Sequence, residues 1–259
     1  MTSYEILCRD LADIGIGPGD VLIVHSSLSS MGYVEGGAVT VIRALLDTLG
    51  EDGTLLFPGF SYRTAYIDST FSLLDTPVCV GKIPETFRTL PGVRRSFHPT
   101  HSVCGIGKFV EELLSDHALD DTPMGIHSPY RKLPAYNGKI LMLGCSLSSN
   151  SFMHGMEEAA GVPYVLREHH VFRMTDGEGN TVEKGIRRHN FTRPEGTVYQ
   201  RYIRTTDVLD ESAGDYRRGK IHGADSVLLY TRVLEQKAIA KMKEDPYYFI
   251  DDPDGLLNK

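Results

Sequence analysis

The pattern of apolar and polar residues over the first 60 positions alternates between helix-like and strand-like segments. Residues 3–14 carry apolar side chains at helical spacing, and the run Val21–Val24 that follows is continuously apolar, as in a strand covered on both faces. A second helical pattern covers residues 38–49, and the next apolar run ends at Pro58. Strand, helix and strand in this order predict a parallel or mixed α/β sheet.

The rest of the chain predicts one more buried strand, an accessory hairpin, and a C-terminal strand that is followed by a helix. "GKILMLGC" (138–145) is strongly apolar and leads into a helix that begins near residue 151. Alternating residues around the turn "TDGEGN" predict a β-hairpin within 165–206, serving as a lid or accessory element. We expect a single α/β domain over residues 1–259, with a mixed central sheet flanked by helices.

Composition and charge then exclude some classes of function. Of the 259 residues, 41% are hydrophobic and 24% are charged, which is typical of a globular protein with a sizeable core. No apolar run approaches the roughly 20 residues that span a bilayer, and the N-terminus lacks the layout of a signal peptide, so we expect no membrane contact and a cytoplasmic location. The net charge of −7 opposes nucleic-acid binding, which requires a basic face.

Two of the apolar runs end in turns that are rich in serine and glycine. The first, "VHSSLSSMGYVEGG", spans Val24–Gly37 and precedes a helix. Ligands of open α/β sheets bind beyond the carboxyl ends of the strands, and free N–H groups at a helix N-terminus favour anions. One interpretation is a cradle for the phosphates of a nucleotide-like cofactor. A plain helix cap with solvated serines explains the segment equally well.

The segment "RRSFHPTHS" (94–102) lies in a proline-rich stretch, 62–102, that we expect to be irregular apart from a short helix at 82–89. Arg95 and its neighbours form either a rigid polar loop that contacts a pyrophosphate and places a histidine near a reacting carbonyl, or an ordinary surface loop. His98 and His101 have a spacing that suits a metal, but no third ligand accompanies them, and we predict no metal site.

The segment "SFMHGMEE" places His154 three residues before Glu157 and four before Glu158, so either acid can share a helix face with the imidazole. A carboxylate bound to one imidazole nitrogen leaves the other as a general base. The alternative is a surface ion pair. A rival mechanism is an acyl-enzyme on Cys145, which otherwise is a small core residue. The four cysteines include no CxxC pair, which argues against a structural zinc site or disulfides.

Five segments, in order, resemble the aminoglycoside 3-N-acetyltransferase family, and the match is collinear from about residue 4 to about residue 245. They are "VLIVHSSLSSMGYVEGGAVTVIRALLDTLGEDGTLLFPGFSY", "HPTHSVCGIG", "LDDTPMGIHSPYRKL", "GKILMLGCSLSSNSFMHGMEE" and "YRRGKIHGADSVLL". The resemblance implies an α/β fold distinct from the common acetyl-CoA acetyltransferase fold. It also implies acetyl-CoA as the donor and the 3-amino group of a 2-deoxystreptamine ring as the acceptor.

The same resemblance implies roles for particular residues. His154 matches the catalytic histidine and Glu157 its acid, and the transfer is expected to be direct. Tyr62 and Asp68 lie where the aminosugar binds, and we add Glu158 to this acceptor side. Ser102 matches a position at the pantetheine arm, and we count Arg95 with it. The remaining coenzyme A contacts are expected in the serine-glycine turn: Ser26, Ser27, Leu28, Val34, Gly36 and Gly37.

One segment departs from the family. Where relatives that modify aminoglycosides carry many acids, this chain has "IRRHNFTRPEG", and Arg187 and Arg188 would repel a polycation if they faced the pocket. The acids are then supplied by Glu168, Asp176, Glu178 or Glu183, or the acceptor is a non-antibiotic amine such as an aminosugar. A coenzyme A-binding protein without turnover is a third alternative. We expect a monomer or homodimer whose partners are coenzyme A and a small amine.

Overall fold

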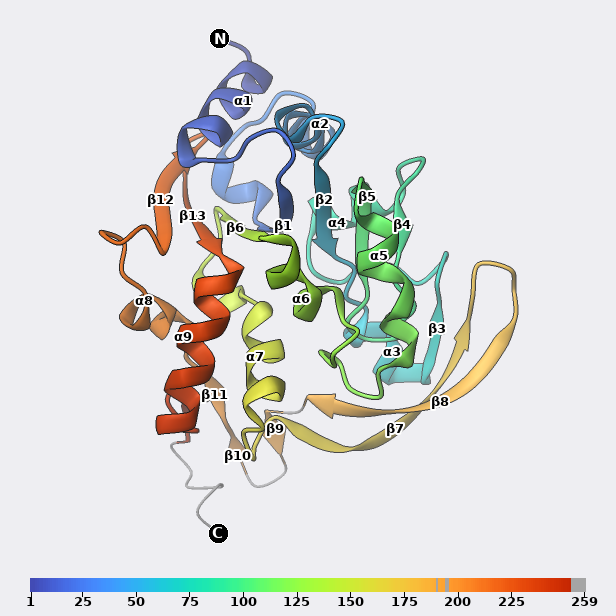
Figure 1. Ribbon diagram of the computed structural model, residues 1–259. Coiled ribbons are helices and arrows are strands. Elements are labelled where there is room, and N and C mark those ends of the chain that lie inside the picture. The colour runs from blue at the N-terminus through green and yellow to red at the C-terminus, as the bar shows by residue number, and fades with distance from the viewer. Residues whose placement is uncertain (190, 194–195, 253–259) are drawn as a thin grey trace.

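A seven-stranded mixed sheet forms the centre of the computed structural model, which describes residues 1–189, 191–193 and 196–252 (Figure 1). β1 lies in the middle and pairs in parallel with both β2 and β6, while the outer strands are antiparallel. The predicted fold class is confirmed. In spatial order the strands are β12 (Tyr216–Ile221), β13 (Ala224–Tyr230), β6 (Lys139–Leu143), β1 (Val21–Ser26), β2 (Thr54–Pro58), β5 (Val103–Gly107) and β4 (Arg94–Arg95).

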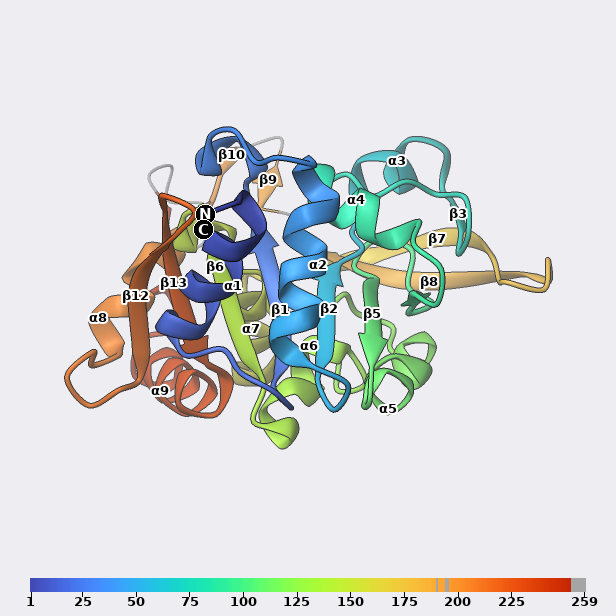
Figure 2. The same cartoon turned by 90° about the horizontal axis from the view of Figure 1, so that it is seen from above.

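Helices cover both faces of this sheet, and so its central strands carry continuous apolar runs, such as Val21–Val24 in β1 and residues 140–143 in β6. Leu22 and Val24 of β1 pack into one apolar cluster, whereas Val21 and Ile23 pack into the other. Figure 2 shows α1 and α2 lying over the central strands on the first of these faces. The first face carries α1 (Ser3–Ile14), α2 (Gly37–Leu49) and α4 (Lys82–Arg88), and the second α5 (Val110–Leu114), α6 (Pro129–Lys132), α7 (Phe152–Ala160) and α9 (Thr231–Glu244).

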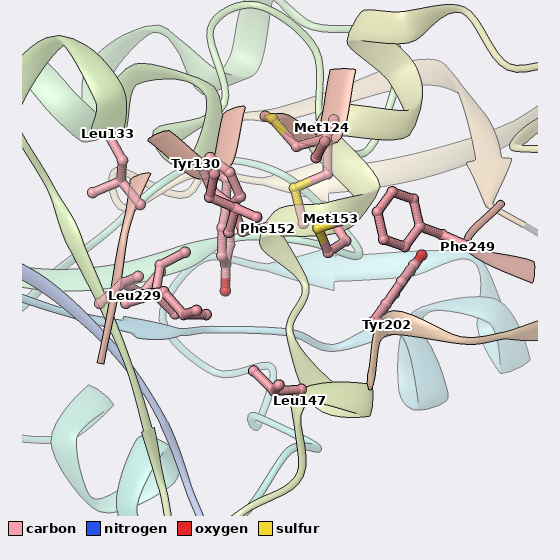
Figure 3. Packing of buried hydrophobic residues seen from close by; sticks show 14 of the residues in the cluster. Met124, Tyr130, Leu133, Leu147, Phe152, Met153, Tyr202, Leu229 and Phe249 are labelled. Atoms are coloured by element: carbon pink, nitrogen blue, oxygen red, sulfur yellow. The ribbon is translucent and has the colours of Figure 1, made fainter. Parts of the chain in front are cut away.

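The helix α7 is held in place by its apolar side chains. Phe152, Met153 and Met156 are fully buried. Figure 3 shows Phe152 and Met153 among other members of the same cluster, including Met124 and Tyr130. Burying a side chain of this size stabilises the fold by roughly 1.5–3 kcal/mol. The apolar face therefore anchors α7 firmly, which fixes the direction of its polar residues.

A second, three-stranded sheet contains the predicted hairpin. β7 (Leu166–Thr175) and β8 (Thr181–His189) are antiparallel, and β3 (Thr70–Ser72) runs parallel to β7. Figure 1 shows this hairpin projecting from the body of the molecule beside β3. Beyond it, residues 190 and 194–195 of the accessory segment, and residues 253–259 of the expected domain, lie outside the described residues. The described part continues with β9 (Thr192–Arg193), β10 (Gly196–Thr197), β11 (Tyr199–Gln200), α8 (Thr205–Val208) and β14 (Ile250–Asp251).

The expectations about the secondary structure are partly wrong. The short helix expected at 82–89 forms as α4, but the stretch 62–102 also contains α3 (Tyr62–Asp68), β3 and β4, because it pairs with strands distant in the sequence. The C-terminal strand is a pair, β12 and β13, joined at His222 and Gly223, whose φ angles of 48° and 83° are those of a tight hairpin turn. No helix of the described residues is long and apolar enough to cross a membrane.

Short 3-10 turns connect several of these elements. They are η1 (Leu28–Met31), η2 (Ser115–Leu119), η3 (Leu133–Tyr136), η4 (Leu147–Ser149) and η5 (Tyr202–Arg204). η1 and η4 follow β1 and β6, so both serine-rich turns lie at the same end of the sheet. The strand topology therefore brings together two segments that are separated by more than a hundred residues.

Candidate active site

A cavity of about 460 Å³ opens where the parallel strands end. Its wall includes Ser26 at the end of β1, Pro58 at the end of β2 and Cys145 just beyond β6. These strands are mutually parallel, so their carboxyl ends meet at one edge, where ligands bind in open α/β sheets. The volume is typical of a small-molecule site.

His154 lies on this wall, and its hydrogen bonds determine which nitrogen is free. The hydroxyl of Tyr202 donates to Oε2 of Glu157 at 2.7 Å and lies 2.8 Å from Nδ1 of His154. Because a tyrosine has one proton to donate, Nδ1 must carry a hydrogen and donate to the Tyr202 oxygen and to Oε2 of Glu157, 3.1 Å away. In the neutral imidazole, Nε2 is then the nitrogen with the free lone pair.

Glu157 stands behind this histidine and is completely buried. Its second oxygen, Oε1, accepts a hydrogen bond from the Tyr164 hydroxyl at 2.8 Å. Burial and the neighbouring carboxylate raise the pKa of Tyr202 and of Tyr164 above the ordinary tyrosine value, so both stay protonated donors. In the structure His154 is hydrogen-bonded to Glu157 rather than to Glu158, and the catalytic roles of His154 and Glu157 stay predictions. The helical spacing did not reveal the two tyrosines, because Tyr202 comes from a distant turn.

Glu158 points elsewhere and is not part of the cavity wall. Its carboxylate binds the Thr122 hydroxyl at 2.5 Å, the Met124 backbone N–H at 2.8 Å and Nε2 of His189 at 2.6 Å. The expected direct contact between Glu158 and the acceptor is therefore not supported by its position. Residues three and four positions along a helix both lie near the face of the first, so helical spacing does not distinguish the two glutamates, and the contacts of Glu158 with other segments do.

The predicted coenzyme A turn begins at the cavity and continues away from it. Ser26 lines the cavity, while the following residues extend along η1 toward α2. Gly36 and Gly37 have φ angles of 75° and 58°, a left-handed backbone that glycine adopts without strain, and no side chain caps α2. Free N–H groups at this helix start are consistent with an anion cradle. The coenzyme A contacts of Ser26, Ser27, Leu28, Val34, Gly36 and Gly37 stay predictions.

Arg95 and Ser102 belong to a hydrogen-bond network beside the cavity, and neither residue is part of the described cavity wall. The Arg95 guanidinium donates to the carbonyl oxygens of Gly59 and Thr76, both at 2.6 Å, and to the Ser102 hydroxyl at 2.9 Å. Ser102 in turn donates to the Gly59 carbonyl at 2.6 Å. Burial lowers the pKa of Arg95 to about 10. These bonds occupy the Arg95 donors that a cofactor would otherwise use. Residues 98–102 are all buried, and this burial rules out the interpretation of the segment as a surface loop.

The predicted acceptor residues are divided between the cavity and the surface. Tyr62 lines the cavity and stacks on His101 with ring centroids 6.0 Å apart. Asp68 is exposed at the end of α3, where it accepts a bond from the Thr70 N–H at 3.1 Å. Its side chain therefore lies outside the described cavity wall.

The two arginines suspected of facing the pocket are engaged elsewhere. Arg187 donates to the Arg167 carbonyl at 3.1 Å, and Arg188 pairs with Glu168 and lies over the Tyr66 ring. Neither belongs to the described cavity wall. The other proposed acids do not belong to it either: Asp176, Glu178 and Glu183.

The described wall of the cavity consequently carries no Asp, Glu, Lys or Arg side chain. Its titratable groups include four histidines, of which sequence reasoning had singled out His101 and His154. Burial lowers the pKa of His25 to about 4, and it also lowers those of His101 and His189 below the ordinary value, so all three are neutral at physiological pH. The described wall is therefore polar and aromatic.

Cys145 also lines the cavity, but its environment suits neither a nucleophile nor a metal ligand. Burial raises the pKa of its thiol to about 12, so hardly any reactive thiolate exists at neutral pH. All four cysteines are free. Within residues 1–189, 191–193 and 196–252, no three His, Cys, Asp or Glu side chains are arranged to hold a metal ion.

Comparisons with known proteins identify the family of this chain. The aminoglycoside 3-N-acetyltransferase family profile matches residues 23–243. The chain is 34% identical over 269 aligned residues to aminoglycoside N(3)-acetyltransferase VII of Streptomyces paromomycinus, covering 92% of this chain and 90% of that protein. Among solved structures, a mutant of aminoglycoside acetyltransferase AAC(3)-IVa in complex with a gentamicin superposes with a TM-score of 0.83, at 26% identity and 98% and 93% coverage of the two chains.

A second structure, AAC-IIIb in a binary complex with CoASH, superposes with a TM-score of 0.81, at 26% identity and with 94% and 97% of the two chains covered. The chain therefore belongs to the aminoglycoside 3-N-acetyltransferase family. The predicted family and enzyme class, an acyltransferase, are confirmed, and acetyl-CoA is the co-substrate of this family.

Proposed function

We propose that this protein transfers the acetyl group of acetyl-CoA directly to an amino group of an aminoglycoside, the 3-amino group of its 2-deoxystreptamine ring. The observation that carries the proposal is the hydrogen-bonded group of His154, Glu157 and Tyr202 at the cavity wall. A protein that only binds coenzyme A needs no base oriented in this way. The names of its relatives support the acceptor class.

In the proposed reaction, Nε2 of His154 takes one proton from the acceptor ammonium. The amine nitrogen attacks the thioester carbonyl carbon, the new C–N bond forms, and the C–S bond of acetyl-CoA breaks. The proton on His154 passes to the departing thiolate sulfur, and a second ammonium proton is released to solvent. Glu157 and Tyr202 hold the imidazole in the correct tautomer and stabilise its charged form.

The test is release of the coenzyme A thiol from acetyl-CoA with gentamicin, kanamycin or a neomycin-type aminoglycoside as acceptor. We expect turnover by the wild type and a fall of about 10²–10⁴-fold in kcat for His154→Ala, with unchanged equilibrium binding of coenzyme A. Unchanged turnover by His154→Ala would contradict the general-base role. Binding of acetyl-CoA without transfer to any amine would favour the non-catalytic alternative.

A second candidate acceptor is an amine with a single positive charge, such as a simple aminosugar. It is favoured by the lack of Asp and Glu side chains on the described wall of the cavity, since a polycation gains most from nearby carboxylates. Comparing kcat/KM for glucosamine with that for kanamycin at low and at high salt separates the two. Preference for kanamycin that weakens at high salt would favour the aminoglycoside, because screening reduces long-range attraction between charges.

A further inference from the structure

Two consecutive glutamates of α7 each hold a histidine of the cavity wall. Glu157 holds His154, as described above, and Glu158 holds His189, which lies 31 positions later at the end of β8. The ring centroids of the two histidines are 4.8 Å apart. The mechanism derived so far uses the first pair and leaves the second, buried pair without a role.

The contacts of Glu158 determine the tautomer of His189. Oε1 of Glu158 already accepts the Met124 N–H at 2.8 Å, so it is also the acceptor toward Nε2 of His189 at 2.6 Å. Nε2 must then carry the hydrogen, and Nδ1 has a free lone pair. Both side chains are deeply buried, with 4% of His189 and 5% of Glu158 exposed, so water does not compete for this bond.

Nδ1 of His189 is buried and has no hydrogen-bond partner among the described residues. Leaving such an atom unpaired costs about 1–3 kcal/mol, which a bound donor recovers. Other residues of the wall share this property. In the described part of the chain, three of the buried side-chain atoms without a hydrogen-bond partner belong to residues that line the cavity: Ser26 Oγ, Asn150 Nδ2 and His189 Nδ1.

Taking the proposed acetyl transfer as given, we propose that His189, oriented by Glu158, binds the acceptor amine beside His154 by accepting a hydrogen bond from one of its N–H groups. An ammonium has three such groups, so His154 removes one proton while His189 holds another. This contact orients the nitrogen toward the thioester carbonyl. The two carboxylates lie one layer behind the imidazoles of a described cavity wall that itself carries no acid.

The decisive variant is His189→Gln, because the glutamine amide nitrogen takes the place of Nε2 and keeps the bond to Glu158, while no acceptor remains at Nδ1. We expect kcat/KM for the amine to fall roughly 10- to 100-fold, the cost of losing a hydrogen bond to a charged group. KM for acetyl-CoA and the unfolding temperature should change little. His189→Asn, which returns an oxygen near the Nδ1 position, should recover part of the loss.

The matched control is His169→Gln, a change at an exposed histidine of β7 in the same hairpin, which should leave both kinetic constants unaltered. Unchanged amine kinetics in His189→Gln would overturn the proposed contact. So would a parallel loss in stability and in both KM values, since that is the effect of a merely structural residue. If the wild type itself transfers acetyl groups to no amine, it is the proposed function that fails.

Discussion

Replacing Glu157 by glutamine removes a charge from the centre of the catalytic network while changing almost no volume. The buried carboxylate accepts bonds from Tyr164, Tyr202 and Nδ1 of His154. Glutamine keeps one oxygen but substitutes a donating NH₂ group for the other. When this group faces His154 it donates to Nδ1, which moves the imidazole proton to Nε2. The histidine then cannot accept a proton from the amine.

The expected magnitude follows from these contacts. In a serine protease triad, a wrong tautomer of the same kind lowers kcat by about 10⁴-fold, and we expect a fall of about 10³–10⁴-fold for Glu157→Gln. Two hydrogen bonds to a carboxylate become weaker neutral ones, so the free energy of unfolding should fall by about 1–3 kcal/mol. The assay is thiol release at saturating acetyl-CoA and amine, with urea unfolding measured in parallel.

Glu183→Gln, at an exposed site on β8, is the matched control and should behave as the wild type. Equilibrium binding of coenzyme A should be unchanged in both variants. A folded Glu157→Gln protein whose kcat stays within about fivefold of the wild type would refute the tautomer reasoning, because only a misoriented base predicts a loss of about 10³-fold or more.

Three further outcomes follow from the structure. Cys145→Ala should keep kcat within about threefold, because a thiol with a pKa of about 12 supplies little nucleophile; loss of transfer would instead support the acyl-enzyme. Arg95→Lys should lower the free energy of unfolding by about 2–4 kcal/mol in urea titrations, since an ammonium cannot replace the forked bonds to Gly59 and Thr76; a raised KM for acetyl-CoA at unchanged stability would show direct cofactor contact. Burial lowers the pKa of His25 to about 4 and of His117 to about 3, below the unfolded value near 6.5, so the unfolded state binds protons first. The free energy of unfolding should therefore fall between pH 6.5 and pH 5, by up to about 1.4 kcal/mol per pH unit for each of these two histidines. A midpoint of urea unfolding that stays constant over this pH range would contradict the prediction.

The local pattern of the sequence predicted the elements that depend on near neighbours. The apolar run Val21–Val24, the helix after Gly37 and the hairpin around "TDGEGN" all form as expected, because side-chain periodicity and turn chemistry are local properties. The same holds for His154 and Glu157, which helical spacing alone brings together. Resemblance to a family added the acetyl donor.

The tertiary structure decided everything that depends on residues far apart in the chain. Tyr202 and His189 reach the cavity from segments that lie well beyond α7 in the sequence, and no spacing indicates that they do. The same packing turned Glu158 toward His189 and buried the donors of Arg95 against backbone carbonyls. The orientation and the burial of a polar side chain set its hydrogen bonds and its pKa. Both are determined only when the sheet and its helices have packed together in the folded protein.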